Sequence, residues 1–149
     1  MPERNASARA FEGKYSFASR MENGPGTNPE ELIGAAEAGC FSMAFANELS
    51  KAGHKPQEIS TSATVHFDLV GGGFSITKIA LKTEGVVPGI DETTFKKIGE
   101  EAKKTCPVSR ALTGTQVVLD ATLKSGVTAA FSFSSTCSPS TGWSSIAGE

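Results

Sequence analysis

The longest apolar pattern in the chain has the spacing of a helix, which we expect to span residues 29–52. Asn28 is a good N-cap, Pro29 suits the first helical position, and Glu31 completes a capping-box arrangement. Small residues give the helix a narrow cross-section, so we expect it to be central and largely buried. Gly53 should end it. Its apolar positions approximate one face: Leu32, Ile33, Ala36, Cys40, Met43, Ala44 and Leu49.

Alternation of apolar and polar residues predicts strands on both sides of this helix. The segment KYSFASR, residues 14–20, alternates in this way, and we expect a short strand that carries Arg20. Residues 59–70 alternate toward their end, and residues 74–87 follow after three glycines, so these segments predict a β-hairpin. A last strand is expected at residues 115–125.

Two further helices are expected between the hairpin and the last strand. Asp91 suits the N-cap of a helix at residues 92–104. Pro107 suits the first position of a short helix within residues 105–112. Strands, a long helix, a hairpin and further helices together indicate an α+β fold.

The whole chain has the size and composition of one folded domain with a tail. Its 149 residues are 38% hydrophobic and 20% charged, and we assign residues 1–126 to a single domain. From Gly126 onward Ser, Thr, Gly and Ala dominate, so we expect residues 127–149 to form a divergent tail. Within this tail, residues 127–136 have the composition of one more strand.

Charge and hydropathy exclude several kinds of partner. The net charge is −2 and no Lys/Arg cluster exceeds two adjacent residues, which argues against nucleic-acid binding. No apolar run approaches the roughly 20 residues that span a bilayer. The N-terminus has charges of both signs and lacks the apolar segment of a secretory signal. We therefore expect a cytoplasmic protein that binds neither nucleic acid nor membrane.

Three cysteines, Cys40, Cys106 and Cys137, are the residues best suited to chemistry. Their odd number and wide spacing make a poor disulfide framework. No pair has the spacing of a zinc site, and His54 and His66 complete no metal-binding set. The sequence therefore predicts neither a metal nor another cofactor.

Cys40 and Cys106 differ in their expected surroundings. Cys40 lies on the predicted apolar face of the long helix, where a small core residue is the plain interpretation. Cys106 lies at a helix N-terminus, where free N–H groups stabilise a thiolate, and a chance capping residue is an equal alternative. Two thiols can reduce a peroxide, because one becomes a sulfenic acid and the second condenses with it to a disulfide. The sequence leaves open whether the two side chains meet.

A thiol in the middle of a helix stays protonated near neutral pH unless a cation lies close to it. Glu30 lies ten residues before Cys40, close to the same helix face, and could hold Arg20 as that cation. The alternative is that Glu30 is a surface acid and Arg20 is solvated.

Three segments resemble the OsmC/Ohr superfamily, and more narrowly its OsmC branch of osmotically inducible hydroperoxidases. They are FASRMENGPGTNPEELIGAAEAGCFSMA (17–44), ITKIALKTEGVVPGID (76–91) and CPVSRAL (106–112). The resemblance implies an α+β fold with an antiparallel sheet, and an intertwined homodimer with two active sites at its interface. It also implies thiol-dependent reduction of organic hydroperoxides to alcohols, without a cofactor.

The same motifs imply a role for each candidate residue. Cys40 is similar to the peroxidatic cysteine of this family and Cys106 to the resolving cysteine with which it forms a disulfide. Arg20 and Glu30 resemble the pair that positions and activates the thiolate. The implied reductant is a dithiol, commonly a dihydrolipoyl group on a partner protein.

The chain departs from the family pattern in three places. Glu37 replaces a histidine three residues before Cys40, and it would raise the thiol pKa if it faced the thiolate. Only 19 residues precede Arg20, so we expect an incomplete N-terminal strand pair, with SARAFEG (7–13) as its remnant. The tail matches nothing in the family, and its Cys137 is expected to be incidental.

Two other functions remain open from sequence. A non-catalytic dimer could hold a hydrophobic ligand in the same apolar pocket, with the cysteines as packing residues. A redox sensor would share the thiol chemistry without sustained turnover. Four apolar side chains could line such a pocket or simply pack in the core: Ile33, Phe41, Met43 and Phe45.

Overall fold

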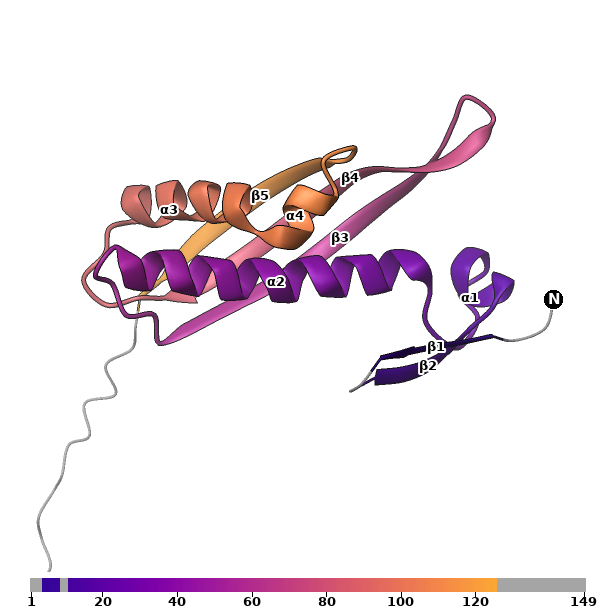
Figure 1. Ribbon diagram of the computed structural model, residues 1–149, viewed down its shortest axis with the longest axis horizontal. Coiled ribbons are helices and arrows are strands. Elements are labelled where there is room, and N and C mark those ends of the chain that lie inside the picture. Colours follow the sequence, from indigo (N-terminus) through magenta and orange to yellow (C-terminus); the bar gives the residue numbers. More distant parts are fainter. Residues whose placement is uncertain (1–3, 9–10, 126–149) are drawn as a thin grey trace, which may run out of the picture.

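The computed structural model describes residues 4–8 and 11–125 of the chain. Three helices lie along one face of a three-stranded sheet, and a small N-terminal hairpin with a short helix lies beyond one end of the longest helix (Figure 1). In chain order the elements are β1 (Arg4–Ala8), β2 (Phe11–Tyr15), α1 (Phe17–Met21), α2 (Pro29–Lys51), β3 (Glu58–Val70), β4 (Gly73–Val86), α3 (Glu92–Thr105), α4 (Pro107–Ala111) and β5 (Gln116–Lys124). This arrangement confirms the α+β fold.

The sheet is mixed, which corrects the expectation of an antiparallel sheet. Its strand order is β3-β4-β5, with β3 and β4 antiparallel and β4 and β5 parallel. A tight turn reverses the chain between β3 and β4, as predicted. From β4 to β5 the chain instead crosses over through α3 and α4, and such a long connection returns it in the original direction.

The long helix α2 forms where it was predicted. The Asn28 side chain accepts a hydrogen bond from the Glu31 backbone N–H at 2.8 Å, which caps the helix at its first turn. Its buried face differs from the predicted one, since Met43 is 76% exposed and Ala36 is also exposed. The buried side is made by Glu30, Gly34, Glu37, Phe41, Phe45 and Leu49.

Large aromatic rings decide which side of α2 is buried. Phe45 packs on Phe41 and on Phe95 of α3, with ring centroids 5.6 and 4.7 Å apart. Gly85 of β4 lies under this cluster, where an added methyl group would lie 2.6 Å from the Phe95 ring. The rings bury more area than the alanines and methionine of the predicted face, so they turn α2 toward the sheet.

The N-terminal region corrects one expectation. A β1–β2 hairpin precedes the segment that carries Arg20. Arg20 itself lies on helix α1 and not on a strand. The cause is a reciprocal cap: the Ser19 N–H donates to Ser16 Oγ at 3.1 Å, and the Ser16 N–H donates to Ser19 Oγ at 2.8 Å.

The remaining elements follow the prediction. Asp91 caps α3 by accepting a hydrogen bond from the Thr94 N–H at 2.9 Å, and Cys106 stands at the N-cap of α4 with Pro107 first in the helix. No helix within the described residues is long and apolar enough to cross a membrane. The predicted tail, its possible strand and Cys137 fall outside the residues that the structure describes.

Candidate active site

The structure brings Cys40 and Cys106 together from two different helices. Cys40 is half-buried on α2, and Cys106 is fully buried at the junction between α3 and α4. Cys106 lies close enough to raise the pKa of the Cys40 thiol, and neither cysteine is in a disulfide. Pairing of two free thiols is the requirement for a reversible dithiol–disulfide cycle.

The surroundings of Cys40 keep its thiol protonated. Burial raises the pKa of Cys40 above its usual value, and the nearby Cys106 and the charge of Glu37 raise it further. The backbone N–H of Val108, in the first turn of α4, opposes this by stabilising the thiolate and lowering the pKa. These dominant influences include no cation, so among the described residues Cys40 lacks the activating partner that a nucleophilic thiol needs.

Glu37 faces the thiols and not the solvent. It is fully buried on α2, one turn before Cys40, and its Oε1 accepts a hydrogen bond from the Ser109 hydroxyl of α4. Its other carboxyl oxygen, Oε2, has no hydrogen-bond partner among the described residues. Of the two orientations left open by the sequence, this is the one that raises the Cys40 pKa.

Arg20 and Glu30 form a bidentate ion pair at the N-terminal end of α2. Arg20 Nε lies 3.1 Å from Glu30 Oε2, and Nη2 lies 2.5 Å from Oε1. The Glu30 residue is only 8% exposed, whereas the Arg20 side chain is 40% exposed. Two parallel charge-assisted hydrogen bonds fix the plane of the guanidinium.

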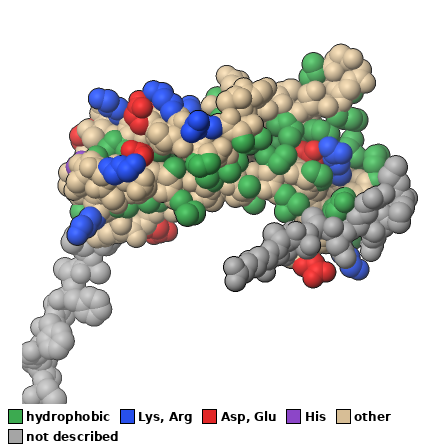
Figure 2. Space-filling model, in the orientation of Figure 1, with side chains coloured by type: hydrophobic (Ala, Val, Ile, Leu, Met, Phe, Trp, Pro, Cys, Tyr) green, Lys and Arg blue, Asp and Glu red, His purple; other side chains and the backbone are tan. Residues whose placement is uncertain are grey.

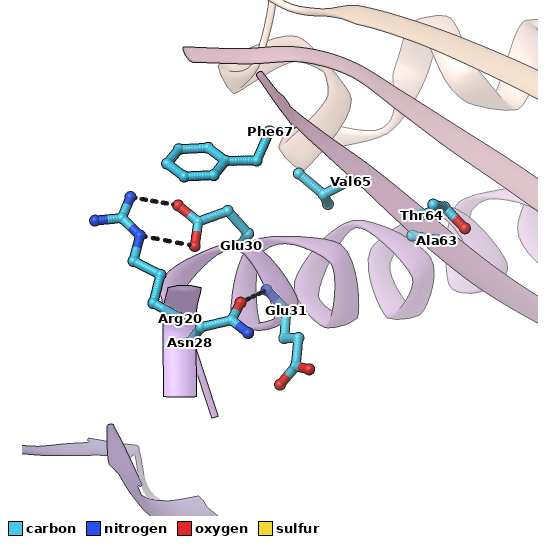
Figure 3. A pocket seen from close by; sticks show the side chains of 8 residues that line it. All are labelled: Arg20, Asn28, Glu30, Glu31, Ala63, Thr64, Val65 and Phe67. Atoms are coloured by element: carbon cyan, nitrogen blue, oxygen red, sulfur yellow. Dashed lines mark hydrogen bonds and ion pairs between the residues drawn. The ribbon is translucent and has the colours of Figure 1, made fainter. Parts of the chain in front are cut away.

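Phe67 of β3 completes this second group. The Arg20 Cζ lies 4.7 Å from the centroid of the Phe67 ring, a cation–π distance, and Phe67 stacks on Phe74 of β4 at 5.0 Å. Figure 3 shows the guanidinium beside the Glu30 carboxylate, with the Phe67 ring over them. A pocket of about 350 Å³ lies here, lined by Arg20, Asn28, Glu30, Glu31, Ala63, Thr64, Val65 and Phe67.

The two groups do not meet within one chain. Ten residues separate Glu30 from Cys40, which at 1.5 Å per residue is about 15 Å along the axis of α2. The sequence therefore predicted the members of each pair, but the shared helix face that was expected to join Arg20 to Cys40 does not bring them into contact. Among the described residues no group of three His, Cys, Asp or Glu side chains could hold a metal ion.

Sequence reasoning missed Phe67 and Ser109. Both lie in segments that it had singled out, Phe67 in the alternating strand and Ser109 in the CPVS motif, but neither motif says which side chains face the site. Phe41 and Phe45, considered as pocket lining, are fully buried core residues, and Met43 is exposed to solvent.

Apolar side chains remain exposed near both groups. Phe17 and Met21 lie on α1 beside Arg20, Phe74 lies on β4 against Phe67, and Met43 lies one turn after Cys40. Hydrophobic side chains also gather between the helices and the projecting end of the β3–β4 hairpin (Figure 2). Together they make an unusually apolar surface for a single chain.

Comparison with known proteins identifies the family. A family model described as OsmC-like protein matches residues 22–121. Peroxiredoxin OsmC of Escherichia coli (strain K12) is 55% identical over 111 residues, which cover 74% of this chain and 77% of that protein. An organic hydroperoxide resistance protein of Xanthomonas axonopodis pv. citri (strain 306) is 31% identical over 73% of this chain and 77% of its own length.

Solved structures share the fold at lower identity. An OsmC-like protein from Mycoplasma pneumoniae matches with a TM-score of 0.65 and 22% identity, covering 81% of this chain and 88% of the other. At this identity the match bears on the fold alone. The family model and the 55% identical relative decide the rest: the chain belongs to the OsmC-like protein family, in its OsmC branch.

Proposed function

We propose that the protein reduces organic hydroperoxides to alcohols, with Cys40 as the attacking thiol and Cys106 as the resolving thiol. The peroxidase class follows from the 55% identity to Peroxiredoxin OsmC. The observation that supports the cysteine mechanism is the closeness of the two free thiols, such that Cys106 raises the pKa of Cys40. A pair of inert core cysteines would need no such closeness between thiols from different helices.

The chemistry has two steps on the protein. The Cys40 thiolate attacks the terminal peroxide oxygen, the O–O bond breaks, and the alkoxide leaves as an alcohol after taking up a proton. Cys40 is then a sulfenic acid. The Cys106 sulfur attacks the Cys40 sulfur, a disulfide forms, and the hydroxyl leaves as water. A dithiol reductant, for which a dihydrolipoyl group on a partner protein is the candidate, restores both thiols.

The thiolate must be activated, and we place the activating cation on a second copy of the chain. Arg20 is held by Glu30 about 15 Å along α2 from the thiol of its own chain. A homodimer could bring the Arg20–Glu30 pocket of one copy against Cys40 of the other. The exposed Phe17, Met21 and Phe74 around the pocket, and the exposed Met43 beside Cys40, support such an interface.

A pocket so arranged would suit a peroxide with an apolar tail. The guanidinium can donate hydrogen bonds to the peroxide oxygens, where negative charge develops as the O–O bond breaks. The exposed apolar side chains, covered by the partner copy, would receive the alkyl group and exclude water. Desolvation would also strengthen the attraction between the cation and the thiolate.

The test is a titration of the reduced protein with tert-butyl hydroperoxide, with free thiols counted and any disulfide located by mass spectrometry. We expect the loss of two thiols per peroxide and a Cys40–Cys106 disulfide. Sustained turnover with a dithiol would then separate an enzyme from a redox sensor. Thiols that stay reduced with excess peroxide would contradict the proposal and favour a protein that binds hydrophobic ligands.

A further inference from the structure

Glu37 is a buried ionisable group that the two steps above do not use. One oxygen of its carboxyl group is held by the Ser109 hydroxyl, and the other has no hydrogen-bond partner in the described part of the chain. Buried polar atoms are almost always paired, so an unpaired carboxyl oxygen with no solvent exposure is costly and calls for a role.

Its position links the two elements that carry the thiols. Glu37 lies three residues before Cys40 on α2, so the two side chains are neighbours one helical turn apart. Ser109 lies three residues after Cys106 on α4. The hydrogen bond between Glu37 and Ser109 therefore joins α2 to α4 beside the thiol pair. The charge of Glu37 also reaches Cys40, since it raises the pKa of that thiol.

The ionisable group of the described structure that the charge of Glu37 is shown to reach is Cys40, which lies close to Cys106. The strands β3 and β4 bring hydroxyl groups to α2, with Thr61 bonded to Ser42 and to Thr83. On α4, Arg110 is exposed to solvent. Three of the four lysines of α3 pair with glutamates of the same helix: Lys96 with Glu92, Lys103 with Glu100 and Lys104 with Glu101. The fourth, Lys97, is exposed to solvent.

We infer that Glu37 is the proton-transfer group of the disulfide-forming step, an inference that rests on the proposed function. The Glu37 carboxylate takes the proton of the Cys106 thiol as the Cys106 sulfur attacks the sulfenic sulfur of Cys40. The S–O bond breaks, and Glu37 gives the proton to the leaving hydroxide, which departs as water. The Cys106 sulfur is oxidised, the Cys40 sulfur is reduced, and Glu37 returns to its starting state. Ser109 is a positioning residue that aims the carboxyl group.

This role explains why a carboxyl group is tolerated beside a thiol that must ionise. A negative charge at Glu37 opposes formation of the Cys40 thiolate, so it slows the attack on peroxide. After that attack Cys40 is a neutral sulfenic acid, so the charge of Glu37 no longer opposes ionisation of Cys40. The carboxylate then acts as the base that accepts the proton of the Cys106 thiol. A glutamate at position 37 therefore slows the attack on peroxide and speeds the formation of the disulfide.

The two steps can be separated with 4,4′-dithiodipyridine in a Cys137→Ser background. This oxidant releases one thiopyridone when Cys40 attacks it and a second when Cys106 attacks the mixed disulfide on Cys40. The variants are Glu37→Gln, which keeps the shape but carries no titratable proton, and Ser109→Ala. Glu48→Gln is the matched control, since Glu48 lies on the same helix and pairs with Lys51 at the surface.

We expect Glu37→Gln to change the two releases in opposite directions. The first release becomes faster near neutral pH, because a charge that raises the Cys40 pKa is gone. The second becomes at least roughly 10-fold slower and loses the carboxyl ionisation from its pH profile, in line with the usual size of general-base effects. Glu48→Gln should change neither release.

An unchanged second release in Glu37→Gln would overturn the inference, as would an equal slowing of both releases together with a lower melting temperature. If Glu37→Gln does not fold, Ser109→Ala decides the matter: a slower second release with a shifted pH profile supports the inference, and an unchanged profile overturns it. Because closure is measured without peroxide, wild-type protein that closes but does not consume tert-butyl hydroperoxide contradicts only the proposed function.

Discussion

The middle and the N-terminal end of α2 carry groups of opposite character. Around Cys40 and Cys106 the structure is closely packed, with one half-buried and one buried thiol beside the aromatic core. Around Arg20 and Glu30 it is open and charged, and it rests on the five-residue helix α1 and on hydrogen bonds between serines. The middle of the helix therefore holds the thiols of the proposed mechanism, and the N-terminal end holds the charge proposed to activate them.

The comparison shows that one chain keeps the two groups apart. A helix of fixed rise cannot bring residues ten positions apart together, however well their faces align. The proposed function therefore assigns the assembly of the site to a second copy. The predictions below test whether the two groups work together, beginning with the largest expected effect.

The largest loss of activity is expected when Cys40 is replaced. Cys40→Ser should reduce peroxide consumption to the background rate, because a serine hydroxyl is not ionised near neutral pH and does not form a disulfide. Peroxide consumption with a dithiol reductant is the measurement. Cys137→Ser is the control and should keep the wild-type rate. Turnover by the Cys40→Ser protein at the wild-type rate would remove Cys40 from the mechanism.

Loss of the resolving thiol should leave the first step intact. We expect Cys106→Ser to consume about one equivalent of peroxide quickly and then to accumulate sulfinic acid at Cys40, because no second thiol protects the sulfenic acid. Intact-mass spectrometry after added peroxide detects the two extra oxygen atoms. A protein that stays at the sulfenic stage under excess peroxide would mean that another group protects Cys40.

Loss of the Arg20 guanidinium should lower the activity about 10²-fold. Arg20→Gln removes the donors aimed at the developing charge, and we expect kcat/KM for an organic hydroperoxide to fall by roughly 10². Arg20→Lys keeps the charge but loses the bidentate bond to Glu30, so an intermediate loss is expected.

Mixing variants shows whether the arginine acts across copies. When Arg20→Gln and Cys40→Ser chains are unfolded together and refolded, a mixed dimer contains one copy with an intact Cys40 and one with an intact Arg20. Activity should reappear if the two residues of a site come from different copies. Two inactive parents whose mixture stays inactive would place Arg20 and Cys40 of one site in the same chain.

The Cys40 pKa should depend on association. Burial raises the pKa of Cys40 in the single chain, so its alkylation by iodoacetamide should speed up with pH until well above the usual range for a thiol. In a dimer with Arg20 close by, the midpoint should fall by about one pH unit or more. Peptide mass spectrometry at low and high protein concentration measures both. Equal midpoints at all concentrations would argue against activation by a second copy.

The smallest expected effect concerns the packing of β4 against α3 at Gly85. A methyl group added at Gly85 would lie 2.6 Å from Phe95 and 2.9 Å from Ile59, so Gly85→Ala should lower the free energy of unfolding by about 1–3 kcal/mol. Nothing lies within 4 Å of the corresponding position at Gly114, and Gly114→Ala should change it by less than about 0.5 kcal/mol. Urea denaturation compares the two, and equal values would mean that β4 can move away from α3.

Sequence reasoning succeeded where local chemistry decides the structure. Asn28, Asp91 and Pro107 mark helix starts by their side chains alone, and all three stand where they were expected. It failed where distant contacts decide. The slim α2 offers more than one face, and only the rings of Phe41, Phe45 and Phe95 select the buried one.

The same distinction explains the outcome at the site. The motifs predicted Cys40, Cys106, Arg20 and Glu30, and the structure places the cysteines together and the ion pair together. The distance of about 15 Å between the ion pair and the cysteines was not recognised, because residues on the same helix face were assumed to lie close together. Ser16 and Ser19 formed a cap for α1 that the alternation of apolar and polar residues had concealed. The parallel pairing of β5 depends on the crossover through α3 and α4, which no local pattern specifies.

The unequal burial of the two thiols has a consequence for how the disulfide is opened. Cys106 is fully buried between two helices, whereas Cys40 is reached from the surface. We therefore expect an incoming reductant to approach the sulfur of Cys40 in the proposed disulfide, with Cys106 as the leaving thiol. The covalent intermediate would join the reductant to Cys40, and the second thiol of a dithiol reductant would then release it from that one sulfur.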